Sequence, residues 1–373
     1  MVRDFKSQTF VFISSRRGQT MGRVERRMLR VMQALVDAGA QVNVICTPRG
    51  PLERTAREMG FEVAPYHLDA FNFLRTRSRV RKYLRRYAPV VVHSTGLEAD
   101  LVARWAAREL KTAAVDSITC VDWPRAGATA LSRSISRYLD ASTIEYADAI
   151  VTDCATLAQK LREQGIPDEH IVLDPPSIDV AEVLSQAEEP WRPPDRPLGP
   201  LVGYGGRIQA SRGLETLVAA SAILDARGAI AEVVIAGEGP LLRDLRSDNR
   251  SSRVRYLGYV PSVPAVLKRL EVAVFPSVEP GVPTSLLEAA ALGRPIVASR
   301  VQGISELFEP DVEIKLVPPG DAKALAVQIA ELLEDPEEAA EMGERARKRT
   351  LDEYSSAASI ERHMALYRRL MAL

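Results

Sequence analysis

The chain has 373 residues, enough for two domains that each bury a full core. Its 46% hydrophobic content with 6% aromatic residues is typical of an α/β protein, and no apolar run approaches the roughly 18–20 residues of a membrane span. The net charge is zero, but residues 1–100 hold 18 Lys/Arg against 9 Asp/Glu, which favours an anionic partner for the first half or, alternatively, a solvated basic face.

Cysteine use and the N-terminus both indicate a reducing compartment. The three cysteines are widely spaced and form no Cys-x-x-Cys pair: Cys46, Cys120 and Cys154. This argues against a disulfide framework and against a zinc site. The first residues lead directly into a strand pattern rather than a signal peptide, so we expect a cytoplasmic protein.

The first half alternates short apolar strands with amphipathic helical stretches such as 23–38 and 77–87, as βαβ units do. We expect strands at 10–14, 42–47, 62–66, 90–93, 113–116, 149–152 and 171–173. Because these strands are apolar nearly throughout, they predict a parallel sheet covered on both faces.

A proline-rich break follows. Residues 185–200 contain five prolines, which remove backbone donors and interrupt helices. We therefore predict an N-terminal α/β domain at 1–184, a linker at 185–200 and a second α/β domain at 201–354.

The second half restarts the alternation. Strands are expected at 201–204, 232–236, 254–257, 272–275, 295–298 and 314–317. We expect a long charged helix that begins after Asp335, its N-cap, and ends near residue 353. The tail, 355–373, is a further helix.

The most informative stretch is 278–289, which follows an apolar strand pattern. Pro283 fits the first turn of a helix, where its missing N–H costs nothing. The exposed N–H groups of that turn form an anion site, and we expect them from Ser285, Leu286 and Leu287. Glu288, about a turn further in, can accept hydrogen bonds from two sugar hydroxyls. An anion site beside a diol acceptor suits a nucleotide diphosphate.

A glycine-rich turn after strand 201–204 points to the same ligand. Gly205 and Gly206 let the backbone approach a phosphate closely. Arg207 and Arg212 add fixed positive charge that can clamp phosphate oxygens in two places. The alternative is a glycine turn with solvated arginines, which we favour for the loop alone. Together with the helix start near Ser285, the loop predicts a diphosphate site.

These motifs resemble the signature of retaining glycosyltransferases with two facing Rossmann-like domains, the GT-B fold, of the large Glu-x7-Glu family (glycosyltransferase family 4 type). The matching residues are Gly281, Pro283, Leu287, Glu288 and Ala289, with Arg207 and Arg212 at the family's Gly-Arg and Lys-Gly positions. The resemblance covers residues 203 to about 354 continuously. It implies that the first domain, 1–184, binds the acceptor and that the second, 201–354, binds the nucleotide sugar. It also implies that the helix at 355–373 crosses back to the first domain.

The resemblance also implies roles for single residues. Arg207, Arg212 and Glu279 are expected to be catalytic, although the position eight before Glu288 is Pro280 rather than a glutamate. Further donor contacts are implied for Gly22, at the start of a helix, and for Gly258 and Val260, near the nucleobase.

The acceptor side matches less well. Strand 113–118 resembles a family strand that ends in a functional histidine, and Ile118 stands in its place. The residues expected on this side are Asp116, Ser117 and His93. His93 follows a predicted strand at its carboxyl end, where α/β proteins bind ligands. The more ordinary interpretation is a histidine hydrogen-bonded within the fold.

Residues 71–97 contain no Asp or Glu and include a basic helix at 75–86. One face of this helix carries an apolar stripe, and arginines crowd the rest. The pattern predicts peripheral association with an anionic membrane, at the inner membrane surface. The alternative is a core-facing stripe with a solvated back.

We expect a metal-independent retaining glycosyltransferase of the hexosyltransferase type. It would use a nucleotide-diphosphate sugar as substrate, need no cofactor or metal, and bind no nucleic acid, since no Asp-x-Asp, ligand cluster or aromatic-rich basic platform occurs. The alternatives are a nucleotide-sugar-binding protein without transfer, or an epimerase or phosphorylase of the same architecture. The base, the sugar and the acceptor are not encoded in a readable motif.

Overall fold

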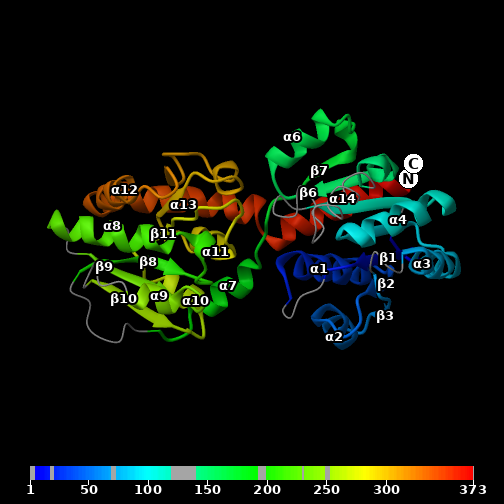
Figure 1. Ribbon diagram of the computed structural model, residues 1–373, viewed down its shortest axis with the longest axis horizontal. Coiled ribbons are helices and arrows are strands. Elements are labelled where there is room, and N and C mark those ends of the chain that lie inside the picture. The colour runs from blue at the N-terminus through cyan, green and yellow to red at the C-terminus, as the bar shows by residue number, and fades with distance from the viewer. Residues whose placement is uncertain are drawn as a thin grey trace. The chain divides into compact units, whose positions relative to one another are not determined.

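A computed structural model describes residues 5–16, 21–68, 73–118, 140–191, 199–228, 231–247 and 253–372. The chain forms two compact units, Met1–Pro175 with Ser359–Leu373, and Pro176–Ala358 (Figure 1). Each unit is built on a parallel sheet with helices on its faces. This confirms the expected α/β class with two doubly wound, Rossmann-like domains.

The first unit contains a seven-stranded sheet in the order β3-β2-β1-β4-β5-β6-β7, with every neighbouring pair parallel. The strand order changes direction between β1 and β4, and in doubly wound sheets a ligand-binding crevice forms at the carboxyl ends of two such strands. The strands are β1 Thr9–Ser14, β2 Gln41–Cys46, β3 Glu62–Pro65, β4 Val91–Thr95, β5 Ala113–Ile118, β6 Ala149–Thr152 and β7 Ile171–Leu173.

Helices cover both faces of this sheet because the side chains of each strand alternate between them. Phe10 and Phe12 face a layer that includes α1 (Arg23–Asp37) and α14 (Ser356–Ala372). Val11 and Ile13 face the layer of α3 (Phe73–Tyr87) and α4 (Leu97–Leu110). The remaining helices are α2 Pro51–Glu58, α6 Ala155–Glu163, and the 3-10 turns η1 Ile144–Tyr146 and η2 Asp168–His170.

The second unit contains a six-stranded sheet in the order β10-β9-β8-β11-β12-β13, again parallel throughout. Its strands are β8 Leu201–Gly205, β9 Glu232–Ala236, β10 Val254–Gly258, β11 Val272–Phe275, β12 Ile296–Ser299 and β13 Lys315–Val317. Its sheet order changes direction between β8 and β11, which marks the carboxyl ends of these two strands as the place for a ligand.

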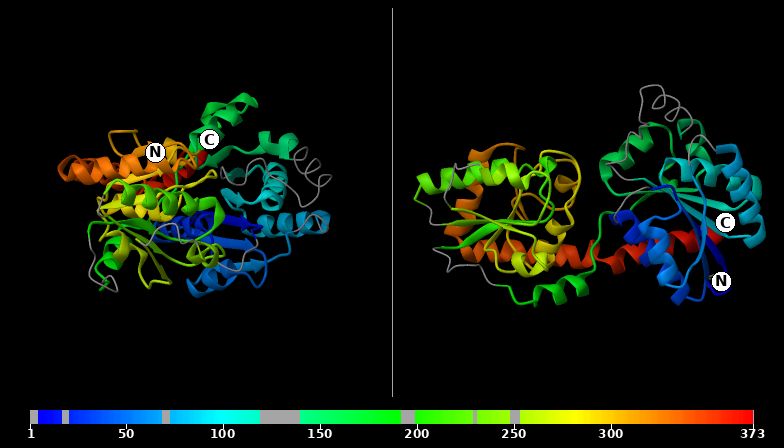
Figure 2. Two further views of the ribbon diagram at one scale, coloured as in Figure 1. Left: turned by 60° about the vertical axis from the view of Figure 1, so that its left-hand side comes forward. Right: turned by 60° about the horizontal axis from the view of Figure 1, so that its bottom comes forward.

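The helices of the second unit form layers around one continuous core (Figure 2). Helices α8 and α12 pack on each other, while α11 packs on α10, α13 and α7. Aspartates cap three of the helices at their N-termini, as their types predict: Asp179, Asp321 and Asp335. The bounds are α7 Val180–Ala187, α8 Leu214–Ala226, α9 Leu242–Ser247, α10 Val263–Leu267, α11 Thr284–Ala291, α12 Ala322–Glu334 and α13 Pro336–Glu353, with η3 Ala210–Arg212 and η4 Ile304–Glu306.

The compact units divide the chain at other positions than the sequence-based boundaries. The change of unit lies at Pro175 and Pro176, before α7, and not in the proline-rich segment 185–200. Helix α7 packs on α10 and α11, so residues 180–187 belong to the second unit. The chain returns to the first unit at Ser359, within α14. Part of the predicted linker, 192–198, lies outside the described residues.

Two further properties of the described residues concern membrane crossing and metal binding. None of their helices combines the length and apolar character that crossing a bilayer requires. They also contain no group of three or more His, Cys, Asp or Glu side chains placed to hold a metal ion. Cys46 and Cys154 are both buried and neither takes part in a disulfide, while Cys120 lies outside the described ranges.

Candidate functional site

A pocket of about 340 Å³ opens in the second unit beside the ends of β8 and β11. It brings together the turn after β8, the first turn of α11 and the segment before α10. Five of the residues predicted from the sequence line this pocket: Gly206, Arg207, Arg212, Ser285 and Glu288. The lining residues are Gln186, Tyr204, Gly206, Arg207, Arg212, Pro261, Val263, Pro264, Pro283, Thr284, Ser285 and Glu288.

The turn after β8 is held tightly and needs glycine. Gly206 has a φ of +141°, and a Cβ there would lie 2.9 Å from the Tyr204 hydroxyl and 3.0 Å from Ser285 Oγ. The Gly206 N–H donates to the Ala236 carbonyl at 3.0 Å, which ties the turn to β9. The turn therefore approaches the first turn of α11 so closely that a side chain at Gly206 would separate them.

Gly205 has a different role from the one its position suggests. It is buried and does not line the pocket. A Cβ on Gly205 would lie 2.7 Å from Val263 Cγ1 of α10. Gly205 thus allows α10 to pack against β8, and it is Gly206 that brings the backbone to the pocket.

Helix α11 begins one residue later than the motif suggests. Pro283 is its N-cap, in extended conformation, and the Leu286 N–H donates to the Pro283 carbonyl at 3.1 Å. Leu286 and Leu287 are fully buried in the core and do not line the pocket. The residues that do are Thr284 and Ser285, whose N–H groups precede the first intrahelical bonds. Thr284 was missed because Pro283 was placed inside the helix.

Three charged side chains surround this helix start. Arg207 is exposed at the pocket, while Arg212 and Glu288 are half-buried. Two of these charges act on the pKa of the buried Tyr204. Burial raises the pKa of Tyr204 to about 12, the charge of Arg212 opposes this rise and that of Glu288 adds to it. Two cations and a carboxylate therefore converge on one hollow at the N-terminus of a helix, where anions bind favourably.

Other predicted donor-site residues lie apart from the pocket. Glu279 is exposed and does not line the pocket, although later residues of the same stretch, 283–288, contribute to its lining. Gly258, which has a φ of +70°, accepts a hydrogen bond from the Gly237 N–H at 2.8 Å and does not line it either. Val260 packs against the core, and the following residues Pro261 and Val263 form the pocket wall instead.

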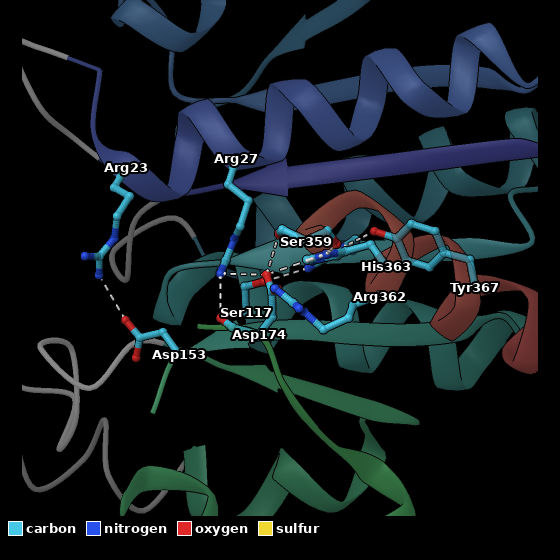
Figure 3. Close-up of polar contacts among 10 residues, drawn as sticks. Arg23, Arg27, Ser117, Asp153, Asp174, Ser359, Arg362, His363 and Tyr367 are labelled. Carbon is cyan, nitrogen blue, oxygen red and sulfur yellow. Dashed lines mark hydrogen bonds and ion pairs between the residues drawn. The ribbon is translucent and has the colours of Figure 1, made fainter. Parts of the chain in front are cut away.

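The first unit places Gly22 at the N-cap of α1. A Cβ there would lie 2.4 Å from Glu25 Oε2, so glycine leaves room for Glu25 to fold back over the helix start. Glu25 also forms an ion pair with Arg16 at 3.4 Å. The next residue, Arg23, pairs with Asp153 at 3.0 Å (Figure 3).

The predicted acceptor-side residues are buried in a polar network. His93 lies within β4, not after it, since the strand extends to Thr95. Its Nδ1 is 2.6 Å from the Tyr367 hydroxyl and its Nε2 is 2.7 Å from Ser117 Oγ. Burial lowers the pKa of His93 well below its usual value, so the ring is neutral. Asp116 is also buried and pairs with Arg104. The side chain of Ile118 lies outside the described residues.

A second buried cluster in this unit went unpredicted. Asp174, which follows β7, accepts hydrogen bonds from Arg27 at 3.0 Å, Ser359 at 2.8 Å and Arg362 at 2.8 Å (Figure 3). Burial alone would raise the pKa of Asp174, but the charges of Arg27, His363 and Arg362 hold it below its usual value. The carboxylate thus joins α1 and α14 to the end of the sheet. No local pattern signals this cluster, because 185 residues separate Asp174 from Ser359.

Two family models match the chain, one in each unit. Residues 22–176 match a model described as Glycosyl transferase 4-like domain. Residues 199–335 match a model described as Glycosyl transferases group 1. The second match contains the pocket residues from Tyr204 to Glu288.

Individual relatives agree with these models. Alpha-D-kanosaminyltransferase of Streptomyces kanamyceticus is 32% identical over 177 residues, which is 46% of each chain, so the match spans about half the length of that relative. A Campylobacter jejuni relative, N,N'-diacetylbacillosaminyl-diphospho-undecaprenol alpha-1,3-N-acetylgalactosaminyltransferase, is 24% identical over 91% of this chain and 94% of its own. Among solved structures, Anabaena Alr3699/HepE in complex with UDP has a TM-score of 0.79 and 16% identity, covering 98% of this chain and 100% of its own. The last likeness shows the shared fold.

Proposed function

We infer that this chain, a two-domain GT-B glycosyltransferase by the family models that match both of its units, moves a sugar from a nucleotide-diphosphate sugar to a hydroxyl acceptor. The observation that carries this proposal is the pocket of the second unit. There Arg207 and Arg212 stand beside the first turn of α11, and Glu288 lies within the same hollow. This combination suits a diphosphate joined to a ribose.

The donor would lie along the pocket in a defined direction. Its diphosphate would contact the guanidinium groups of Arg207 and Arg212 and the N–H groups of Thr284 and Ser285. The Glu288 carboxylate would accept hydrogen bonds from the ribose hydroxyls. The apolar wall of Pro261, Val263 and Pro264 would contact the base.

We propose that transfer retains the anomeric configuration and needs no metal ion. As the bond between the sugar carbon and the phosphate oxygen breaks, negative charge builds on the leaving diphosphate. Two arginines and a helix N-terminus stabilise that charge more than they stabilise the ground state. The acceptor oxygen bonds to the same sugar carbon, and its proton passes to the leaving phosphate. No step in this scheme requires Glu279, which is exposed.

Thermal-shift measurements with UDP, GDP and ADP sugars test the donor site directly, because a bound ligand stabilises the folded state. We expect one base series to raise the melting temperature of the wild type. Glu288→Gln should lower the affinity for that nucleotide sugar about tenfold or more, since a neutral amide replaces the charged carboxylate that accepts hydrogen bonds from two hydroxyls. Glu331→Gln, on the exposed side of α12, is the matched control and should bind as the wild type does.

The same panel separates the alternatives. Stabilisation by none of the sugar nucleotides would contradict the proposal. Binding without transfer across a panel of hydroxyl acceptors would favour a binding protein on this scaffold. Sugar-nucleotide turnover without an acceptor, or a requirement for free phosphate, would indicate an epimerase or a phosphorylase.

We further propose that helix α3 docks the enzyme on an anionic membrane. Its buried side carries Thr76, Val80 and Leu84. Arg77 and Arg81 pair with Glu109 of α4, so their charges are partly neutralised. The exposed residues Arg75, Arg79, Lys82 and Arg86 recur at intervals of four, three and four, which places them in one stripe along the helix. The name of the Campylobacter jejuni relative, which includes a diphospho-undecaprenol, agrees with a lipid-linked acceptor.

Vesicle co-sedimentation tests this surface. The chain should sediment with vesicles rich in phosphatidylserine and remain in solution with phosphatidylcholine vesicles, because each basic residue near an anionic surface contributes about 1 kcal/mol. Changing the stripe residues Arg75, Arg79, Lys82 and Arg86 to Gln should abolish sedimentation. The control variant changes four exposed basic residues of the second unit to Gln: Arg227, Arg243, Lys323 and Lys348. Equal sedimentation of both variants would show that the basic stripe of α3 is not the membrane-binding surface.

A further inference from the structure

Tyr204 occupies a central position in the candidate donor site, although its residue type was given no role in the motif. It lies on β8 and is 1% exposed. Its ring packs edge-on against Phe275 of β11, with centroids 5.8 Å apart and planes at 67°. The ring is therefore fixed between the two strands whose carboxyl ends border the pocket.

The Tyr204 hydroxyl joins two parts of the pocket. It donates a hydrogen bond to the Arg207 carbonyl at 3.0 Å, across the turn that follows β8. The Cβ position of Gly206 lies 2.9 Å from this hydroxyl and 3.0 Å from Ser285 Oγ. The hydroxyl thus stands where the arginine-bearing turn meets the first turn of α11. At neutral pH it remains a donor, because burial raises the pKa of Tyr204 to about 12.

Other bonds hold the ends of this turn but leave its middle to Tyr204. The Gly206 N–H donates to Ala236 at 3.0 Å, and the Ile208 N–H donates to Glu238 at 2.8 Å. Both bonds fix N–H groups toward β9 and the loop after it. The carbonyl of Arg207, between them, bonds to Tyr204. The orientation of the Arg207 peptide, and with it the direction in which its side chain leaves the backbone, depends on that hydroxyl.

We propose that Tyr204 is a positioning residue for the diphosphate: its hydroxyl holds the Arg207 peptide so that the guanidinium points at the phosphates beside Ser285. This inference rests on the proposed donor site. Tyr204 acts through Arg207 and does not touch the reacting carbon.

The substitution Tyr204→Phe removes one oxygen and keeps the ring that packs on Phe275. The affinity for the nucleoside diphosphate of the recognised base should fall about tenfold, since one net hydrogen bond contributes about 1 kcal/mol or slightly more. The affinity for the corresponding nucleoside, which carries no phosphate, should change less than twofold. Isothermal titration calorimetry with both ligands measures this difference, which a general loss of stability would not produce.

Tyr354→Phe is a matched control in the same unit. Tyr354 is 3% exposed, and its hydroxyl likewise donates to a backbone carbonyl, that of Leu307. Neither residue of that pair lines the pocket. Both variants should therefore lose a similar amount of thermal stability, and only Tyr204→Phe should lose diphosphate affinity.

A double variant tests the route of the effect. If Tyr204 acts through Arg207, Tyr204→Phe adds little to the loss already caused by Arg207→Ala, because neighbouring residues on one pathway are not additive. Fully additive losses, or equal weakening of nucleoside and diphosphate, would overturn the positioning role. If the wild type binds no nucleoside diphosphate at all, the proposed donor site fails whatever Tyr204 does.

Discussion

Replacing Arg207 with alanine is expected to lower kcat/KM for the nucleotide-sugar donor about a hundredfold. Under the proposed mechanism its guanidinium contacts the diphosphate most strongly when negative charge develops on the leaving oxygen. Losing one such charged donor costs about 2.7 kcal/mol or more in the transition state. The pocket retains Arg212 and the first turn of α11, so activity should be reduced rather than abolished. Initial rates over a range of donor concentrations separate kcat from KM.

The matched control for this variant is Arg227→Ala. Arg227 is an exposed arginine of the same unit. It follows the C-terminus of α8, whereas Arg212 lies just before the N-terminus of that helix, roughly 20 Å away at a rise of 1.5 Å per residue. It does not line the pocket. Its removal should leave the rate unchanged. If Arg207→Ala stays within threefold of the wild type, the assignment of Arg207 to the leaving diphosphate is wrong.

Replacing Asp174 with asparagine is expected to destabilise the first unit by about 3–5 kcal/mol, the usual cost of removing one partner from a buried ion pair. The Asp174 side chain is fully buried and that of Arg27 is 9% exposed. The neutral amide would leave the Arg27 guanidinium without its compensating charge in a place that water does not reach. The amide keeps only one oxygen, so it would lose the acceptor either of Arg362, on Oδ1, or of Arg27 and Ser359, on Oδ2. Either loss would weaken the attachment of α14, which carries Ser359 and Arg362.

Urea denaturation followed by circular dichroism measures the loss of stability, and hydrogen exchange of α14 locates it. Exchange of α14 amides should accelerate along with that of β7. Asp168→Asn is the control, since its ion pair with Arg162 is exposed, at 74% and 44%, and contributes less than about 1 kcal/mol. An Asp174→Asn chain as stable as this control would show that the buried pair contributes no net stability.

Much of the fold follows from local sequence patterns. Apolar strands alternating with amphipathic helices predicted both parallel sheets, and Asp335 was identified as the cap of α13 from its type and position. The candidate donor pocket follows nearly as well, because each of its parts is a short strand–turn–helix segment. Gly206, Arg207, Arg212, Ser285 and Glu288 all line it, and the topology of a doubly wound sheet brings such turns to one edge.

The misplaced residues show where local patterns end. Leu286 and Leu287 were expected to offer their amides to the ligand, but the Leu286 N–H donates to the Pro283 carbonyl, both residues are buried in the core, and neither lines the pocket. Glu279 lies in the same motif and points to solvent. His93 was expected at a strand end, but β4 continues to Thr95 and α14 covers the histidine with Tyr367. The side on which a residue lies depends on packing partners that the local sequence does not contain.

The amino-acid sequence by itself determined the two-sheet architecture, the order of the strands along the chain and the cationic, helix-bordered character of the candidate donor pocket. These properties depend on the spacing of neighbouring residues and on backbone chemistry, which are local. The resemblance already implied that the tail helix returns to the first domain, but only the tertiary structure decided that Asp174 holds α14 there, and that the Tyr204 hydroxyl holds the Arg207 carbonyl. Both depend on side chains whose burial and direction are fixed by the packing of whole strands and helices.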